Sequence, residues 1–86
     1  MKFEYDINKS LSNKQKHGID FEEAILLWND DKMVEFKTFY EDEERFINIG
    51  KITAKIYAVV TTYRKENIRI ISARRARNKE VEIYES

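Results

Sequence analysis

The chain has 86 residues, which is enough for one domain with a single small hydrophobic core. Charged residues make up 37% of the sequence, but a 13% share of aromatic residues argues against disorder. The absence of cysteine excludes disulfides and thiolate chemistry and suits a reducing compartment, so a cytoplasmic location is expected. No run of about 18 apolar residues occurs and residues 1–4 lack an apolar segment, so neither a membrane span nor a signal peptide is expected.

The net charge of zero hides an uneven distribution of charge along the chain. Residues 1–50 contain seven Lys or Arg and twelve Asp or Glu, a net charge of −5, whereas residues 51–86 contain nine and four, a net charge of +5. A basic half can bind nucleic acid despite a neutral total, because phosphate contacts are local. The alternative is that the two halves neutralise each other in the fold, and composition does not decide between them.

The N-terminal part of the chain predicts a short strand followed by a surface helix. Residues 3–5 alternate as a short edge strand does, and Asp6 or Asn8 can cap the helix expected over residues 8–17. Ile7 and Leu11 are the sparse apolar positions of this helix, and its lysines form one cationic flank. Gly18 is the residue type that ends a helix in the left-handed conformation.

A second helix is expected from Asp20 onward. Asp20 and Glu23 have the spacing of a capping box, in which each side chain accepts a hydrogen bond from the backbone N–H of the other residue. Apolar residues then recur at i, i+3, i+4 and i+7, namely Phe21, Ala24, Ile25 and Trp28. Trp28 is interpreted as a core anchor rather than as a platform for stacking on a nucleobase.

From residue 33 onward the apolar pattern changes to a period of two, which is typical of strands. Strands are expected over residues 33–40, 44–51, 55–64 and 66–74, and the short gaps between them indicate an antiparallel meander of hairpins. Residues 77–85 can form a last short helix with Val81 and Tyr84 as its contact stripe. The predicted fold class is α+β, a single domain over residues 1–86 with N-terminal helices packed on a four-stranded antiparallel sheet and a short C-terminal helix.

The fourth of these strands leads directly into a cluster of positive charge. Residues 68–73 are mostly apolar, and three of the four residues from Arg74 to Arg77 are arginines. Arginine keeps its charge at any accessible pH, and its planar guanidinium group matches phosphate. A rigid strand that presents arginines at its end can therefore hold a polyanion. The alternative interpretation is a buried strand whose exposed end is simply charged.

Short motifs are spread over nearly the whole chain in a characteristic order and spacing. They are residues 3–6 (FEYD), 16–19 (KHGI), 21–24 (FEEA), 42–46 (DEERF), 49–50 (IG) and 68–74 (IRIISAR), with Tyr57, Val59, Val60, Thr62, Arg64, Glu80 and Tyr84. This ordered set resembles the BrnT toxins of bacterial type II toxin–antitoxin systems. Arg75 stands where such sequences often have lysine, which keeps the charge.

The resemblance implies a RelE-like fold and a ribonuclease that stops translation. It also implies a partner similar to the BrnA antitoxins, which are small proteins with a ribbon-helix-helix DNA-binding domain. Toxin and antitoxin together would repress their own operon, so the toxin is expected to contact operator DNA only through that complex, and to contact no membrane. RNA is the implied substrate.

Metal-free RNA cleavage, in which a 2′-oxygen attacks the adjacent phosphate, needs a base, an acid and positive charge around the phosphorane oxygens. We favour Arg64 and Arg74 as phosphate ligands. Arg74 and Arg75 point to opposite faces of a regular strand, so at most one of them serves a given site unless the strand ends between them. Arg75 and Lys51 would then give wider electrostatic support. The expected RNA-binding residues are Arg45, Lys51, Arg69, Arg75 and Tyr84.

The acid and the base are less clearly marked. His17 can be the acid, because imidazole titrates near neutrality, or it can simply be a histidine at a helix C-terminus. Glu44 is the carboxylate that the family pattern places best for the base, but it can equally form an ion pair with Arg45 or with a cross-strand arginine. Tyr84 can donate a proton from the last helix or pack against its neighbours. One histidine, no cysteine and no carboxylate pair at helical ligand spacing, except Glu22 with Glu23, which capping explains, predict no metal and no cofactor.

Two functions from different classes remain open at this point. The first is an RNA-cleaving toxin, in which His17, Glu44, Arg64 and Arg74 are the catalytic residues. The second is a non-catalytic module that uses the same arginines to bind nucleic acid or an acidic peptide. Arginine-rich clefts serve both purposes, so the sequence alone does not separate them.

Overall fold

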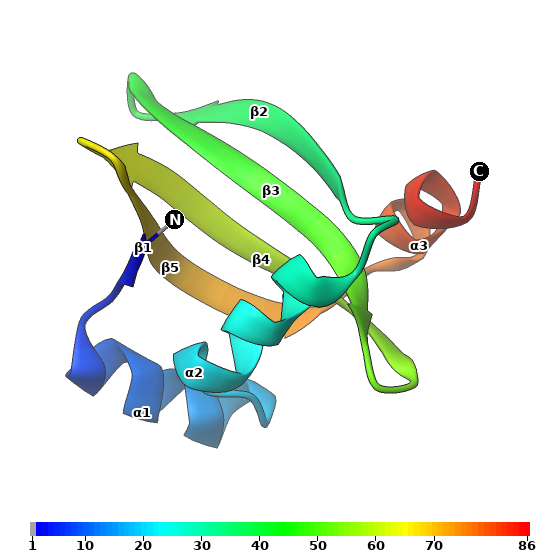
Figure 1. The fold of residues 1–86 in the computed structure, drawn as a ribbon, viewed down its shortest axis with the longest axis horizontal. Helices are drawn as coiled ribbons and strands as arrows, with labels where there is room; N and C mark the ends of the chain where they lie inside the picture. The colour runs from blue at the N-terminus through cyan, green and yellow to red at the C-terminus, as the bar shows by residue number, and fades with distance from the viewer. Residues whose placement is uncertain (1) are drawn as a thin grey trace.

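The computed structural model describes residues 2–86, which form helices on a five-stranded sheet (Figure 1). In chain order the elements are β1 (Lys2–Glu4), α1 (Ile7–His17), α2 (Phe21–Ala24), the 3-10 helix η1 (Ile25–Asn29), β2 (Val34–Tyr40), β3 (Glu43–Ile52), β4 (Lys55–Arg64), β5 (Asn67–Arg75) and α3 (Asn78–Glu85). The α+β class, the N-terminal helices and the short C-terminal helix are confirmed. The strands from β2 to β5 begin and end within one residue of their predicted bounds.

The sheet has one strand more than predicted, and it is mixed rather than purely antiparallel. β2 to β5 form the expected antiparallel meander, but β1 pairs in parallel with β5, with Lys2 opposite Asn67 and Glu4 opposite Arg69. The outer backbone groups at the start of β5 would otherwise lack partners, and β1 supplies them. A three-residue strand is too short for apolar periodicity to reveal its neighbour, so the sequence predicts an edge strand here but not its place in the sheet.

The ends of the first two helices follow the sequence signals. Asp6, rather than Asn8, caps α1, because its Oδ1 accepts a hydrogen bond from the Asn8 backbone N–H at 2.8 Å. Gly18 ends the same helix with a φ of 78°. The capping box is confirmed, since the backbone N–H of Glu23 donates to Asp20 at 2.7 Å and that of Asp20 donates to Glu23 at 2.9 Å.

α1 turns a polar side towards the sheet. Ile7 and Leu11 are 62% and 60% exposed, whereas Asn13 is buried. The Asn13 amide donates to the carbonyl oxygen of Ala73 at 2.8 Å and accepts from the backbone N–H of Ala73 at 3.3 Å. β1 pairs only with the first three residues of β5, so Asn13 acts further along as a substitute for a neighbouring strand.

The second predicted helix lies where expected but winds differently, because α2 continues as a 3-10 helix in η1. Residues three apart align in a 3-10 helix, so Leu27 follows Ala24 into the core, and both are 0% exposed. Trp28, interpreted from the sequence as a core anchor, is only partly buried and packs edge-to-face on Phe3 with the ring centroids 5.0 Å apart. Leu27 therefore takes the central place that a regular α-helix would give to Trp28.

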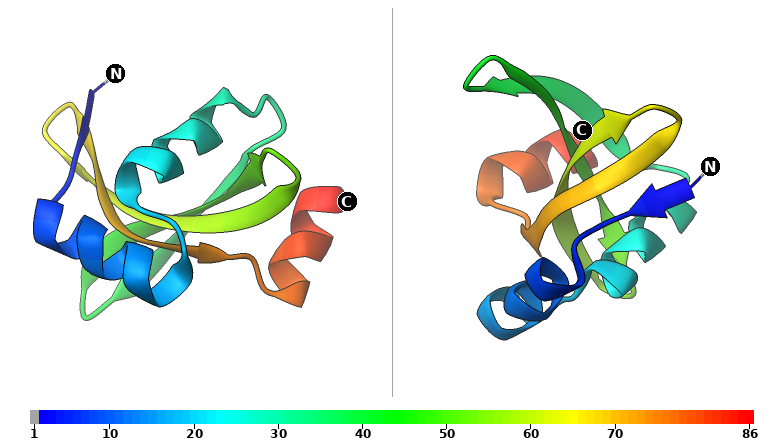
Figure 2. Two further views of the ribbon diagram at one scale, coloured as in Figure 1. Left: turned by 90° about the horizontal axis from the view of Figure 1, so that it is seen from below. Right: turned by 90° about the vertical axis from the view of Figure 1, so that its left-hand side faces the viewer.

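The hydrophobic core lies between the sheet and the N-terminal helices, which cover one face of it (Figure 2). Its buried members are Ile19, Phe21, Ala24, Leu27, Val59, Ile70 and Ala73. Gly50 keeps η1 close to β3, because a Cβ at this position would lie 3.0 Å from Cγ of Leu27. The strand register places Ala58 and Arg74 on the opposite face, where α3 packs against β3. None of the helices in residues 2–86 combines the length and apolar character needed to cross a membrane.

Candidate functional site

Two hollows beside α1 and β5 share the lining residues Lys9 and Ile71, and we treat them together as one groove. The first, of about 420 Å³, is lined by Lys9, Glu43, Arg45, Thr62, Tyr63, Arg64, Arg69 and Ile71. The second, of about 240 Å³, is lined by Lys9, Ser12, Asn13, Lys16, His17, Phe21, Ile71 and Ser72. We call the residues of both hollows the basic groove. Six of them are Lys, Arg or His and one is acidic, so the groove suits a polyanion.

Strand alternation brings the three arginines of the groove to one face. Arg45 comes from β3, Arg64 from β4 and Arg69 from β5, and the register places all three on the face opposite the hydrophobic core. The Arg69 Nη1 lies 2.9 Å from Oε2 of Glu4, and the Arg64 Nη1 lies 3.7 Å from the same oxygen. The sheet therefore brings the three arginines into one hollow, and a carboxylate of β1 contacts two of them, Arg64 and Arg69.

Arg45 is oriented by its neighbours but keeps hydrogen-bonding capacity. Its guanidinium carbon lies 4.7 Å from the centroid of the Tyr40 ring, which is a cation–π arrangement. Its Nε lies 3.5 Å from Oε1 of Glu43, and within residues 2–86 this buried nitrogen has no hydrogen-bond acceptor. A buried donor without a hydrogen bond is costly, and the nearby Glu43 carboxylate offsets part of that cost electrostatically.

The predicted acid and base lie in different places. His17, the last residue of α1, is exposed and lines the second hollow beside Lys16. Glu44 points to the other face of the sheet, where its carboxylate pairs with Lys37 at 3.1 Å. The structure thus brings His17 to the basic groove but does not bring Glu44 there.

Arg74 does not line the groove and is already paired with a carboxylate. Its two terminal nitrogens donate to the two oxygens of Glu80 at 2.7 and 2.9 Å, which ties β5 to α3. Arg75, its neighbour, points to the other face and lies 5.8 Å from the ring centroid of Tyr57. The prediction that these two residues face opposite ways is confirmed, and neither shares a hollow with Arg64.

Glu80→Gln should remove an acid-sensitive part of the stability. The hydrogen bonds from Arg74 hold the pKa of Glu80 below its ordinary value of 4.5, although burial acts in the opposite direction. The folded protein therefore binds this proton more weakly than the unfolded chain, so the stabilisation is present above the ordinary pKa and is lost as pH falls through the lowered, folded-state pKa.

At neutral pH we expect Glu80→Gln to cost about 1.5–3 kcal/mol, the usual range for hydrogen bonds to a charged group. Urea unfolding at neutral pH and at a series of lower pH values measures the difference from the wild type. Glu82→Gln, an exposed position on the same helix, is the matched control. A difference that stays constant with pH would contradict the assigned pKa shift.

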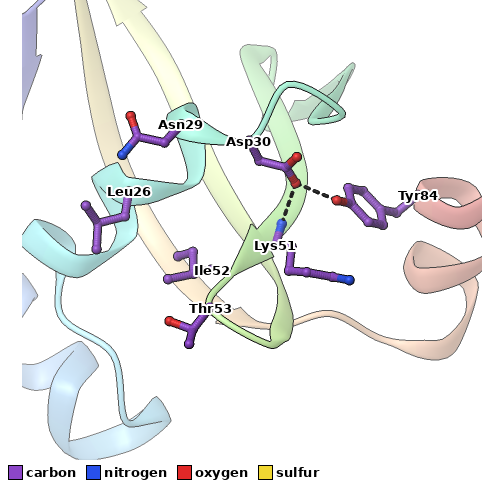
Figure 3. A pocket seen from close by; sticks show the side chains of 7 residues that line it. All are labelled: Leu26, Asn29, Asp30, Lys51, Ile52, Thr53 and Tyr84. Atoms are coloured by element: carbon purple, nitrogen blue, oxygen red, sulfur yellow. Dashed lines mark hydrogen bonds between the residues drawn. The ribbon is translucent and has the colours of Figure 1, made fainter.

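Lys51 and Tyr84 meet at Asp30 rather than in the basic groove (Figure 3). One Asp30 oxygen accepts hydrogen bonds from the Tyr84 hydroxyl and, at 2.7 Å, from the Lys51 backbone N–H. The Tyr84 hydroxyl lowers the pKa of Asp30, and this same hydrogen bond raises the pKa of Tyr84. These contacts anchor α3 to the loop after η1, beside a shallow hollow of about 350 Å³.

Sequence reasoning missed four charged residues at or beside the groove: Lys9, Lys16, Glu43 and Glu4. Lys9 and Lys16 lie seven residues apart, so they share one side of α1, and they belong to the cationic flank expected there. Glu43 precedes Arg45 by two residues, which is the spacing of one strand face. Glu4 could not be found by spacing, because its partners come from the far end of the chain.

The fold and the groove together define a small α+β protein that can hold a polyanion on one side of its sheet. A family model described as ribonuclease toxin, BrnT, of type II toxin–antitoxin system matches residues 5–80. The chain belongs to this family and is a ribonuclease toxin of a type II toxin–antitoxin system, as the resemblance predicts. A search of curated proteins found no match.

Proposed function

We propose that this toxin cleaves RNA in the basic groove by attack of a 2′-oxygen on the adjacent phosphate, without a metal ion. The observation that carries the proposal is the convergence of Arg45, Arg64 and Arg69 from three strands in one groove. Fixed guanidinium groups stabilise the charge that develops on the phosphorane oxygens.

His17 and Glu43 are the proposed proton-transfer residues. His17 lies in the second hollow, where it can protonate the leaving 5′-oxygen. A base must come within hydrogen-bonding reach of the 2′-hydroxyl, and the carboxylate in the groove is Glu43. We therefore assign the base to Glu43 in place of Glu44, whose side chain lies across the sheet beside Lys37.

The other predicted site residues receive supporting roles in this proposal. Arg74 and Tyr84 hold α3 through Glu80 and Asp30, and so fix one end of the sheet. Lys51 and Arg75 are exposed and add positive potential that attracts RNA over a longer range. We also propose the RelE-like class for the fold. Antiparallel strands with N-terminal helices on one face and a short C-terminal helix support it, although β1 adds a fifth strand at the edge.

We further propose a BrnA-like antitoxin with a ribbon-helix-helix domain, through which alone the toxin contacts operator DNA. A type II toxin implies a protein antitoxin, and β2 offers that protein an open sheet edge. Phe39 and Tyr40 at the end of β2 are 67% and 56% exposed. An added strand can pair with this edge while acidic side chains of the antitoxin mask the basic groove.

Complex formation with the antitoxin should slow as salt concentration rises. Opposite charges on the antitoxin and the basic groove steer the encounter, and salt screens that attraction. Stopped-flow association rates over a range of salt concentrations measure the effect, with a toxin that lacks charge at Lys9 and Lys16 as the matched variant. An association rate that is independent of salt would indicate a purely apolar interface.

Purified toxin, freed of antitoxin, should cleave RNA in at least one of two settings, free RNA or RNA on ribosomes. Because no metal ion is proposed, cleavage should persist when a chelator is present. Attack by the 2′-oxygen leaves fragments with 2′,3′-cyclic phosphate and 5′-hydroxyl ends, and a 2′-deoxy substitution at the cleaved nucleotide should block it. Mass spectrometry of the fragments identifies the ends. Different ends would exclude this mechanism, and absence of cleavage in both settings would leave the non-catalytic binding module as the function of the groove.

A further inference from the structure

Glu4 contacts two of the three arginines of the basic groove. Its Oε2 lies 2.9 Å from Nη1 of Arg69 and 3.7 Å from Nη1 of Arg64, and its Oε1 accepts from the amide of Asn67 at 3.1 Å. The carboxylate side chain is 28% exposed, so it lies partly within the protein surface beside the groove. Glu4 precedes the stretch from residue 5 to residue 80 that the family model matches.

The backbone of β1 fixes the place of this carboxylate. Parallel pairing sets Glu4 opposite Arg69, so both side chains leave the same face of the sheet. Phe3 points to the other face and packs on Trp28, which holds β1 against the core. A strand of only three residues thus delivers one charged group to the groove and one aromatic ring to the core.

We propose that Glu4 is a positioning residue of the ribonuclease, which orients the guanidinium groups of Arg64 and Arg69 towards the RNA phosphate. The inference rests on the proposed function of the basic groove. The contact given for Glu4 with each arginine is to Nη1, and a guanidinium group has further N–H donors for the substrate. Arginines that are already oriented need no reorganisation when charge develops in the transition state.

The same carboxylate opposes RNA binding in the ground state, because it places negative charge beside the groove. Its removal should therefore slow cleavage while RNA affinity stays constant or increases. A residue with a purely structural role would instead lower the melting temperature and impair binding and cleavage together. The split between rate and affinity distinguishes the two roles.

The test compares wild type, Glu4→Ala, Glu4→Gln and Glu66→Gln. Glu66 is an exposed carboxylate on the turn between β4 and β5, so its variant controls for the loss of one negative charge near Arg64. Single-turnover cleavage gives the rate, and binding to an RNA with a 2′-deoxy cleavage site gives the affinity. Circular dichroism and melting curves report folding, and spectra of the arginine Nε–H groups report whether Arg69 loses its fixed orientation.

We expect Glu4→Ala to cleave roughly 10- to 100-fold more slowly with affinity unchanged or tighter, the size of effect that a misplaced catalytic group produces. Glu4→Gln should retain more activity, because its amide oxygen still accepts a hydrogen bond, and Glu66→Gln should match the wild type. If Glu4→Ala does not fold, the comparison rests on Glu4→Gln and the arginine spectra. The pH dependence of the rate should keep its acidic limb in both Glu4 variants.

Three outcomes would overturn the inference. One is cleavage at the wild-type rate by folded Glu4→Ala. Another is loss of affinity in proportion to rate. The third is a complete loss of cleavage in both Glu4 variants, together with loss of the acidic limb of the pH–rate profile. That result would make Glu4 the general base instead. An Arg64→Ala variant that cleaves normally would count against the proposed groove itself, so failure of the groove and failure of the Glu4 role are separable.

Discussion

Arg64→Ala is expected to fold normally and to cleave RNA roughly 100-fold more slowly, or worse, than the wild type. The Arg64 side chain is 63% exposed and its main contact is the Glu4 carboxylate at 3.7 Å, so truncation leaves the core untouched. In the proposed mechanism its charge acts on the phosphorane oxygens, which carry their extra charge only in the transition state. The loss should therefore fall on the rate more than on RNA affinity.

Single-turnover cleavage and binding to a 2′-deoxy RNA measure the two effects, with circular dichroism as the check on folding. Arg69→Ala should behave similarly, although it also frees Glu4. Arg77→Ala is the matched control, because Arg77 is exposed at the start of α3 and does not line the basic groove. Wild-type rates in both folded Arg64→Ala and Arg69→Ala would place the active site elsewhere on the protein.

Arg74→Ala should mainly lower stability, whereas the other two arginine variants should mainly lower the cleavage rate. Truncation leaves the Glu80 carboxylate, a residue 9% exposed, without its bidentate partner. Removal of one member of such a pair costs stability, because the remaining charge is desolvated. A lowered melting temperature with a smaller loss of activity would separate the anchoring of α3 from direct contact with phosphate.

Local signals in the sequence predicted the elements well, because they depend on neighbouring residues. The alternation from β2 to β5 and the capping box of Asp20 with Glu23 are contacts within a hairpin or a single helix turn. The pairing of β1 with β5 and the bridge from Asn13 to Ala73 join residues about 60 positions apart. No periodicity marks such contacts, so they appear only in the folded structure.

The candidate site was predicted only in part, because the side on which a strand residue points depends on register. Glu43 and Glu44 differ by one position, and that difference moves a carboxylate across the sheet. A register shift in β5, opposite Val60 and Thr61, likewise changes which face the β5 arginines point to. Arg69 and Arg74 are five residues apart and would alternate in a regular strand, but the irregularity places them on the same face.

Phe21→Ala should cost about 3–5 kcal/mol, a large part of the 5–15 kcal/mol that stabilises a typical small domain. The ring is 1% exposed at the centre of the core and packs edge-to-face on Tyr5 with the ring centroids 5.7 Å apart. Its loss leaves a cavity between the N-terminal helices and β5, because the close-packed neighbouring side chains relax only partially. Equilibrium urea unfolding measures the change in the free energy of unfolding.

The matched controls for this change are Ile7→Ala and Leu11→Ala, since α1 turns these two apolar residues to solvent. Each should alter the free energy of unfolding by no more than about 0.5 kcal/mol, because an exposed side chain buries little area and alanine favours the helix. A Leu11→Ala variant as unstable as Phe21→Ala would mean that α1 packs through its apolar positions. That result would contradict the orientation of α1 in which Asn13 contacts β5. It would also contradict the placement of Lys9, Lys16 and His17 along the groove, which depends on that orientation.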